Sequence, residues 1–199
     1  IAWGLVGSEM CIRDSDKSQD VLRTSMAMGI DRSILVKSQN TLEPLAVAKT
    51  LKIIIDKEKP DLVLMGKQAI DDDSNQTGQI LSALLNWPQG CFISNLKIEN
   101  NKVFISREID EGIENLETSL PAVLTCDLRL NTPRFASLPN IMKAKKKPLE
   151  TIDIDTLGID TSSKIKTLKV IEPPKRKAGI MVNDVKELVQ KLKYEAKVI

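Results

Sequence analysis

The chain has 199 residues, of which 29 are Lys or Arg and 27 are Asp or Glu, and its formal net charge of +2 gives no electrostatic reason to expect binding to nucleic acid or an anionic membrane. Histidine is absent, which excludes Ser-His-Asp and Cys-His catalysis and His-ligated metal sites. The three cysteines are widely spaced without a CxxC motif, and no apolar run approaches the roughly 18 residues of a membrane-spanning helix, so we expect an intracellular protein with reduced thiols that is not an integral membrane protein.

Helical and strand patterns alternate in the first half of the chain. Apolar residues at helical spacing predict helices, and short apolar runs predict strands, in the chain order 18–28, 33–36, 42–59, 61–66 and 77–85. The second strand is an unbroken apolar run, which is typical of a parallel strand buried on both faces. The alternation favours an α/β domain with a parallel sheet.

Extended segments and then a proline-rich tail follow this region. Polar or glycine-containing turns separate four predicted strands, of which the first two form a β-hairpin: 91–98, 103–109, 113–120 and 122–126. From Thr132 onward, five prolines and a lysine cluster predict a tail with little core of its own that lies across another surface. The tail ends in a predicted helix over about 182–193.

The segment 66–78 carries the most chemical information. It leaves the C-terminal end of a predicted parallel strand, the edge at which open α/β sheets bind ligands, and it enters a helix whose first N–H groups favour an anion such as phosphate. Asn75, Gln76 and Thr77 add neutral donors, and Asp72 can accept a hydrogen bond from a ribose hydroxyl or an adenine amino group. These residues indicate a nucleotide site, and a capped, solvated loop is the alternative.

Sharper motifs do not fit this loop. The P-loop and GxGxxG patterns are absent, and an EF-hand is excluded because Gln76 and Ser82 stand where that motif needs Gly and Glu. Magnesium bound by the carboxylates at 71–73 is disfavoured, because three consecutive carboxylates cannot all face one ion. Two other functions stay open at this point: a stand-alone adenine-nucleotide sensor of the universal-stress type, and a metal-dependent hydrolase that uses this acidic cluster.

Seven motifs in a fixed order carry a resemblance to a known family: 22–32, 66–78, 87–90, 107–112, 120–123, 127–131 and 138–145. Together they resemble the electron transfer flavoprotein beta subunit, in its AMP-binding, non-bifurcating branch, over about residues 16–199. The resemblance implies a Rossmann-like, parallel-sheet adenine-nucleotide-binding domain, related to HUP and universal-stress folds, with a β-hairpin portion and an extended C-terminal arm. Residues 1–15 depart from the family and are interpreted as foreign sequence in place of its first strand, which is therefore expected to be missing.

The resemblance also implies a function and partners. It implies an electron carrier subunit instead of a free-standing enzyme, paired with an alpha subunit that holds most of the FAD. Acyl-CoA dehydrogenases and related flavin dehydrogenases would reduce this flavin, which then passes electrons to the membrane-bound electron transfer flavoprotein-ubiquinone oxidoreductase. The setting would be the cytoplasm in a bacterium and the mitochondrial matrix in a eukaryote.

The resemblance assigns residues to two sites. Residues 136–150 become a partner-recognition loop with a basic segment, between a nucleotide-binding domain at 16–135 and an arm at 151–199. On residues alone, Leu138 is equally well explained as a core residue. The expected AMP loop is Gly66, Lys67, Gln68, Ala69, Ile70, Asp71, Asp72, Asp73, Ser74, Asn75, Gln76 and Thr77, with Asn75 to Thr77 on the phosphate and Ala69 and Asp72 on the remainder. The expected docking residues are Leu138, Pro139, Asn140, Ile141 and Met142.

Overall fold

A computed structural model describes residues 15–39, 42–70, 73–175 and 178–199. Of residues 1–15, which the sequence interpretation treats as foreign in place of the first strand, 1–14 lie outside the described residues, and Ser15 begins the first helix. The chain divides into two compact units, of which the first runs to Lys164 and the second is Ile165–Ile199. In the part of the chain that is described, no helix is both long and apolar enough to cross a membrane.

The first unit begins with the predicted alternation of helices and strands. Its first five elements are α1 (Ser15–Ala27), β1 (Ser33–Lys37), α2 (Pro44–Glu58), β2 (Leu62–Gly66) and α3 (Thr77–Leu85). Gly29 follows α1 with a φ of 128°, a conformation that glycine adopts without strain. The helix α2 starts at a proline and stops at Lys59, whose left-handed backbone donates to Ile55 O. The predicted order of elements is confirmed.

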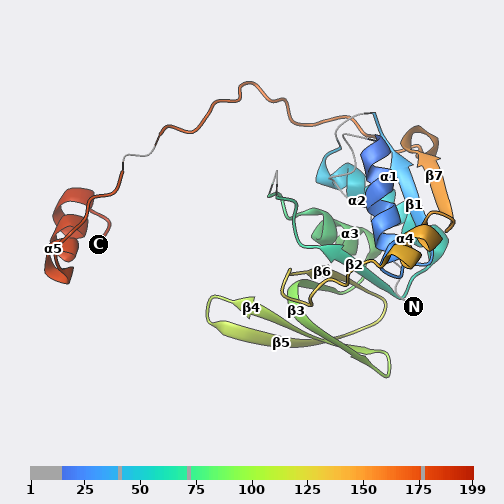
Figure 1. Cartoon of the computed structure of the whole chain (residues 1–199), viewed down its shortest axis with the longest axis horizontal. Coiled ribbons are helices and arrows are strands. Elements are labelled where there is room, and N and C mark those ends of the chain that lie inside the picture. The colour runs from blue at the N-terminus through green and yellow to red at the C-terminus, as the bar shows by residue number, and fades with distance from the viewer. Residues whose placement is uncertain (1–14, 40–41, 71–72, 176–177) are drawn as a thin grey trace. The chain divides into compact units, whose positions relative to one another are not determined.

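The larger of the two sheets in the first unit is a five-stranded mixed sheet (Figure 1). Its other members are β3 (Gln89–Glu99), β4 (Lys102–Ile109), β5 (Gly112–Ser119) and β6 (Ala122–Cys126), in the order β2-β6-β3-β4-β5. The strand β6 pairs in parallel with β2 and β3. The strands β3 and β4 form the predicted antiparallel hairpin, and β5 adds a third antiparallel strand to it. The helices α2 and α3 pack on the sheet around Leu51, Leu81 and Val123. This core is aliphatic, as the small number of aromatic residues requires.

A smaller, two-stranded parallel sheet pairs β1 with β7 (Leu149–Asp153). Before β7, α4 (Leu138–Ala144) packs on α1, and after it a 3-10 turn, η2 (Ile154–Leu157), buries its first residue. The first unit thus continues past residue 151, where the sequence interpretation began the arm. That interpretation missed β7 because its partner strand lies far away in the sequence, and it missed α4 although Ser137 and Pro139 provide a helix-start signal.

The strand β2 is less buried than its unbroken apolar run predicts. Val63 is buried, but Leu64 is 37% exposed and Met65 is half-buried. Within the described residues, β2 pairs only with β6, and β1 pairs only with β7. Although α2 connects β1 to β2, the two strands do not pair with each other, so β2 is an edge strand of the larger sheet as far as the described residues go.

The second unit has a short helical end after an extended segment. The helix α5 (Val185–Gln190) continues into a π-helical turn, η3 (Lys191–Ala196). Asp184 accepts from Glu187 N (2.7 Å), and the Glu187 carboxylate accepts from Asn183 N (2.8 Å), so both side chains cap the helix start. Apolar side chains such as Val185 and Leu188 are exposed within this unit, as expected for a tail without its own core.

Candidate functional site

The carboxyl ends of neighbouring parallel strands meet at one edge of the larger sheet. Lys67 directly follows β2, and Asp127 directly follows β6. Backbone bonds continue past the strands, because Lys67 N donates to Cys126 O (3.2 Å) and Asp127 N donates to Ile93 O in β3 (3.0 Å). The edge at which open α/β sheets bind ligands is therefore fixed by main-chain bonds across β2, β6 and β3.

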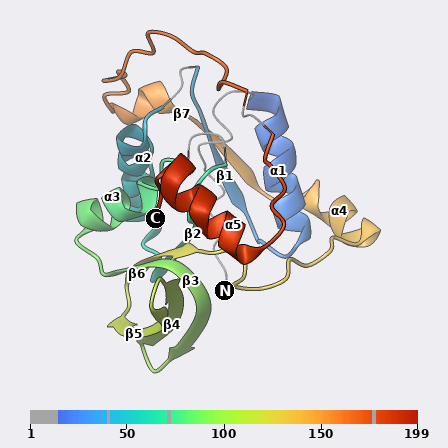
Figure 2. The same ribbon diagram turned by 90° about the vertical axis from the view of Figure 1, so that its left-hand side faces the viewer.

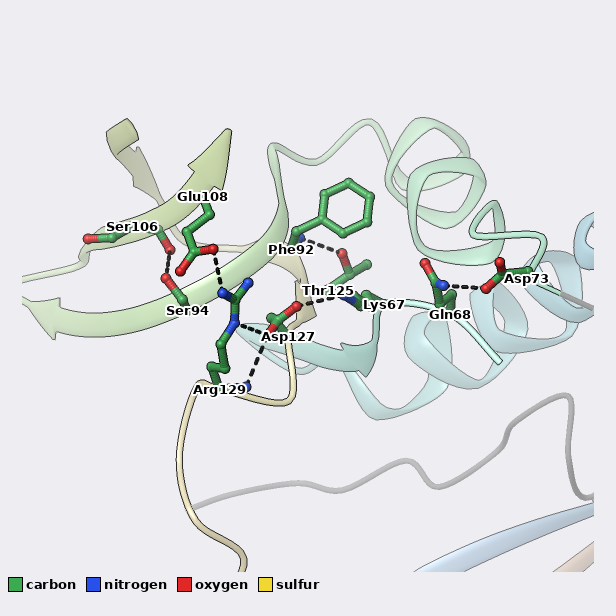
Figure 3. A network of polar contacts seen from close by, with 10 residues as sticks. All are labelled: Lys67, Gln68, Asp73, Phe92, Ser94, Ser106, Glu108, Thr125, Asp127 and Arg129. Carbon is green, nitrogen blue, oxygen red and sulfur yellow. Dashed lines mark hydrogen bonds and ion pairs between the residues drawn. The ribbon is translucent and has the colours of Figure 1, made fainter. Parts of the chain in front are cut away.

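Asp127 is the centre of a polar network at this edge (Figure 3). Its side chain is only 4% exposed, and its Oδ2 accepts from Lys67 Nζ at 2.6 Å. Its Oδ1 accepts from both Arg129 N (3.0 Å) and Arg129 Nε (2.9 Å). The hydrogen bonds from Arg129 and then Lys67 hold the pKa of Asp127 well below its usual range, and the same carboxylate raises the pKa of Arg129. Arg129 also pairs with Glu108 on β4.

The ammonium group of Lys67 has an aromatic neighbour as well. It lies 5.9 Å from the centroid of the Phe92 ring, within cation–π range. Phe92 sits at a register shift in β3 with a φ of 60°, and its N–H donates to Thr125 Oγ1 (3.1 Å). Lys67 is therefore held by an anion and a ring on its own protein, an arrangement that the sequence did not predict.

Sequence reasoning included Lys67 in the site but gave no role to Asp127 or Arg129. A signal for them was present, since both lie in the motif 127–131, where charged residues directly follow an apolar strand. Residues 71–72, which the sequence assigned to the nucleotide, lie outside the described residues.

The first half of the loop leaves the sheet and turns back on itself. Ile70 is 93% exposed, so it contributes no core packing. Asp73 has a φ of 56°, and its N–H donates to Ala69 O (3.1 Å), while its carboxylate accepts from Gln68 Nε2. The loop thus has a local turn of its own before it reaches α3.

The second half of the loop forms the start of α3. Asn75 has a φ of 49°, and its Oδ1 accepts from Gln79 Nε2 (3.2 Å), so the group that it can offer an anion is its amide N–H. Gln76 occupies the N-cap position without a side-chain capping bond, and its carbonyl accepts from Ile80 N (3.0 Å). Thr77 is buried at the first helical position. The N–H groups of 77–79 thus precede the intrahelical bonds, where an anion binds favourably.

Two further features of this helix start fit a mononucleotide. Gly78 lets α3 approach β6 closely, because a Cβ there would lie 2.4 Å from Thr125 Cγ2. Gln79 Oε1 is buried and has no hydrogen-bond donor among the described residues, so a hydroxyl or amino group of a ligand could donate to it. Gly66 has open space around it, and Ser74 is half-buried. The residues present are compatible with a phosphate at the helix start and a polar group of the same ligand beside Gln79.

The expected docking residues lie together on α4. All five are exposed on the first unit: Leu138, Pro139, Asn140, Ile141 and Met142. Leu138 is 78% exposed and Met142 is 70% exposed, so the alternative that Leu138 is a core residue is wrong. The opposite side of the helix is buried through Ala144. The helix therefore presents an apolar ridge outward.

Comparison with known proteins gives a consistent result. A family profile described as Electron transfer flavoprotein domain matches residues 14–157. The chain is 53% identical over 183 residues to the electron transfer flavoprotein subunit beta of Bradyrhizobium diazoefficiens, which covers 92% of this chain and 74% of the relative. It is 50% identical over 196 residues to the mitochondrial subunit beta of Arabidopsis thaliana (98% and 75%), and 53% identical over 179 residues to the subunit beta of Bos taurus (88% and 70%).

Proposed function

The chain belongs to the electron transfer flavoprotein beta subunit family, and on that premise we propose that it is the nucleotide-binding half of a heterodimeric electron carrier. Its partner is an alpha subunit that holds most of the FAD. The observation that carries this proposal is the identity of 50–53% to beta subunits from a bacterium, a plant and a mammal over most of the chain. The FAD supplies the redox chemistry, and this chain supplies binding surfaces. It acts in the mitochondrial matrix of a eukaryote or the cytoplasm of a bacterium.

We propose AMP as the nucleotide of this subunit. Its phosphate binds at the start of α3, where Asn75, Gln76 and Thr77 and the first backbone N–H groups supply donors. Gln79 Oε1, the buried acceptor without a donor among the described residues, supports the nucleotide's polar groups on the same side. The network of Asp127 and Lys67 holds the strand ends from which the loop departs. AMP is structural in this proposal, as the resemblance to the AMP-binding branch of the family implies.

We propose that the apolar ridge of α4 docks the electron donors, which are acyl-CoA dehydrogenases and related flavin dehydrogenases. Exposed Leu138 and Met142 offer apolar area for burial, and the neighbouring lysines offer charge for steering the encounter. An electron transfer flavoprotein-ubiquinone oxidoreductase accepts the electrons. The carrier itself is not an enzyme acting alone.

The stand-alone nucleotide sensor remains the second candidate function, because the α/β fold and the loop suit it equally. The exposed ridge of α4 and the coreless second unit favour the subunit proposal, since a sensor that works alone has no use for unburied apolar surface. The metal-dependent hydrolase has no supporting observation among the described residues, where no group of three side chains could hold a metal ion. Residues 71 and 72 of the acidic cluster are not among the described residues.

The test is to co-express the chain with an alpha subunit and purify the product. The expected result is a yellow one-to-one heterodimer that releases one AMP on denaturation. The Gln76→Ala variant should lose AMP without misfolding, because the Gln76 side chain is exposed and makes no capping bond. Gln190→Ala, an exposed glutamine on α5, is the matched control and should keep its AMP. A colourless monomer that binds AMP and ATP alone would favour the sensor and refute the subunit proposal.

A further inference from the structure

The helices α1 and α4 lie side by side (Figure 1 and Figure 2). Reciprocal side-chain bonds between α1 and the segment 144–147 at the end of α4 hold them together. Arg23 on α1 donates from one guanidinium nitrogen to Ala144 O (2.8 Å) and Lys147 O (2.7 Å) at the end of α4. Lys147 in turn donates from Nζ to Met26 O (3.0 Å) and Ile30 O (2.5 Å) at the end of α1. Arg23 on α1 thus caps the C-terminal end of α4, and Lys147, three residues after α4, caps that of α1.

This reciprocity follows from the chemistry of helix ends. The last carbonyl groups of a helix carry partial negative charge, so cations bind there favourably. Turn amides also donate to two of these oxygens, Gly29 N to Met26 O (3.3 Å) and Lys147 N to Ala144 O (3.2 Å), so the cations add second bonds to them. Arg23 and Lys147 are both half-buried, so water screens their bonds less than it screens those of the exposed lysines at 143, 145 and 146. Lys147 thus differs from its neighbours, although the sequence grouped them as one basic cluster.

The bonds matter most to α4, because this helix has only seven residues. A helix so short is not stable alone in water, so its shape depends on what it packs against. Its buried contact is small, with Ala144 against Met26 and Ala27. The two cations therefore provide much of the attachment that keeps α4 helical with Leu138 outward.

We propose that Arg23 and Lys147 are positioning residues that keep the ridge of α4 in its docking-competent form. The inference rests on the docking role proposed above and adds residues that do not themselves touch the partner. Without the clamp, α4 is in its folded, attached form only part of the time. The apparent affinity for the dehydrogenase then falls by the fraction of molecules that remain competent.

The experiment uses the FAD- and AMP-loaded heterodimer. The Arg23→Met variant keeps the aliphatic stem and removes the donors. Arg134→Met is the control for charge, because Arg134 is an exposed cation near the end of α1. Hydrogen exchange of the amides at 138–147 measures the opening of α4, and steady-state reduction by an acyl-CoA dehydrogenase gives KM and kcat for the heterodimer.

If clamp loss leaves about one molecule in ten competent, Arg23→Met raises KM by about tenfold, and kcat and the FAD and AMP contents are unchanged. Exchange at 138–147 accelerates in the same variant, whereas exchange in β6 does not. Lys147→Met gives the same pattern. Arg23→Lys has a KM and an exchange rate between those of wild type and Arg23→Met, because an ammonium group lacks the fixed, forked donor geometry of a guanidinium.

Three results would overturn the inference. The first is a KM and an exchange rate at 138–147 in Arg23→Met that equal those of Arg134→Met. The second is a raised KM with unchanged exchange in α4, and the third is faster exchange in α4 with an unchanged KM. A wild-type heterodimer that no dehydrogenase reduces would instead refute the docking proposal itself, which separates the two failures.

Discussion

The Asp127→Asn substitution tests whether the buried network stabilises the edge of the larger sheet. Asn retains one oxygen for the two Arg129 donors, but it presents an amide N–H₂ group to the Lys67 ammonium, so the 2.6 Å ion pair is lost. A hydrogen bond to a charged group contributes about 1.5–3 kcal/mol. The Lys67 side chain is 29% exposed, so its ammonium group can regain hydrogen bonds to water in the variant. The expected loss in the free energy of unfolding is therefore near the lower end of this range, at about 2 kcal/mol.

The assay is thermal unfolding of the purified heterodimer at fixed concentration, because subunit association contributes to the midpoint. For a chain of this size, 2 kcal/mol corresponds to a Tm lower by about 4–8 °C at pH 7. Asp160→Asn is the control. Ser162 and Lys164 also hold the pKa of Asp160 below its usual range, but the Asp160 side chain is 60% exposed. The Tm of the Asp160→Asn variant should therefore equal that of the wild type.

The difference should also depend on pH in one direction. The folded state lowers the pKa of Asp127 below the value of about 3.9 in the unfolded chain. The stability from its charge is therefore complete above that value and is lost as the pH falls toward the folded pKa. The Tm gap between wild type and Asp127→Asn should be constant from pH 7 to 5 and narrow below about 4. A gap that is absent at pH 7, or that stays undiminished under acid, would refute this reasoning.

Other positions give separate tests. Leu138→Ala should slow electron uptake from a dehydrogenase in stopped-flow assays without changing FAD content, because removing an anchor leucine costs about 2–4 kcal/mol of docking free energy; loss of FAD would show that Leu138 is structural. Gly78→Ala should lower the Tm through a loss of about 1–3 kcal/mol in the free energy of unfolding, because the new Cβ would lie 2.4 Å from Thr125 Cγ2. Gly179→Ala is the control, since nothing lies within 4 Å of a Cβ there, and its Tm should not change. Equal midpoints for the two variants would contradict the close packing of α3 on β6.

The order of elements from α1 to β6 could be predicted from the sequence because each element carries its own periodicity and stop signals. The pairing of β1 with β7 could not, since strand pairing between distant segments leaves no local pattern. The exposure of Leu64 was missed for a related reason: an unbroken apolar run indicates burial on both faces, but it does not report which neighbouring strands are present.

In the candidate site, too, local patterns could be predicted from the sequence and contacts between distant segments could not. The loop 66–77 was recognisable, since its donors are consecutive and precede a helix. The partners of Lys67 were not, because Asp127 and Phe92 approach it only when β2, β6 and β3 are side by side. The reciprocal bonds of Arg23 and Lys147 could not be predicted from the sequence either, because each side chain donates to backbone carbonyl groups, which have no sequence signature.

The division of the first unit into two sheets separates its tasks mechanically. The proposed nucleotide loop departs from the larger sheet, and α4, the proposed docking helix, is attached through α1 beside the smaller one. Among the described residues no strand belongs to both sheets, and α2 is the segment that joins β1 to β2. On the proposal that donors dock on α4, a disturbance there can reach the loop after β2 through the packing of α1 and through the backbone 127–137 that joins β6 to α4, but among the described residues it has no hydrogen-bonded ladder shared by the two sheets to follow. If the loop binds AMP and α4 docks the donors, as proposed, this separation lets the carrier exchange its electron donors while its nucleotide stays in place.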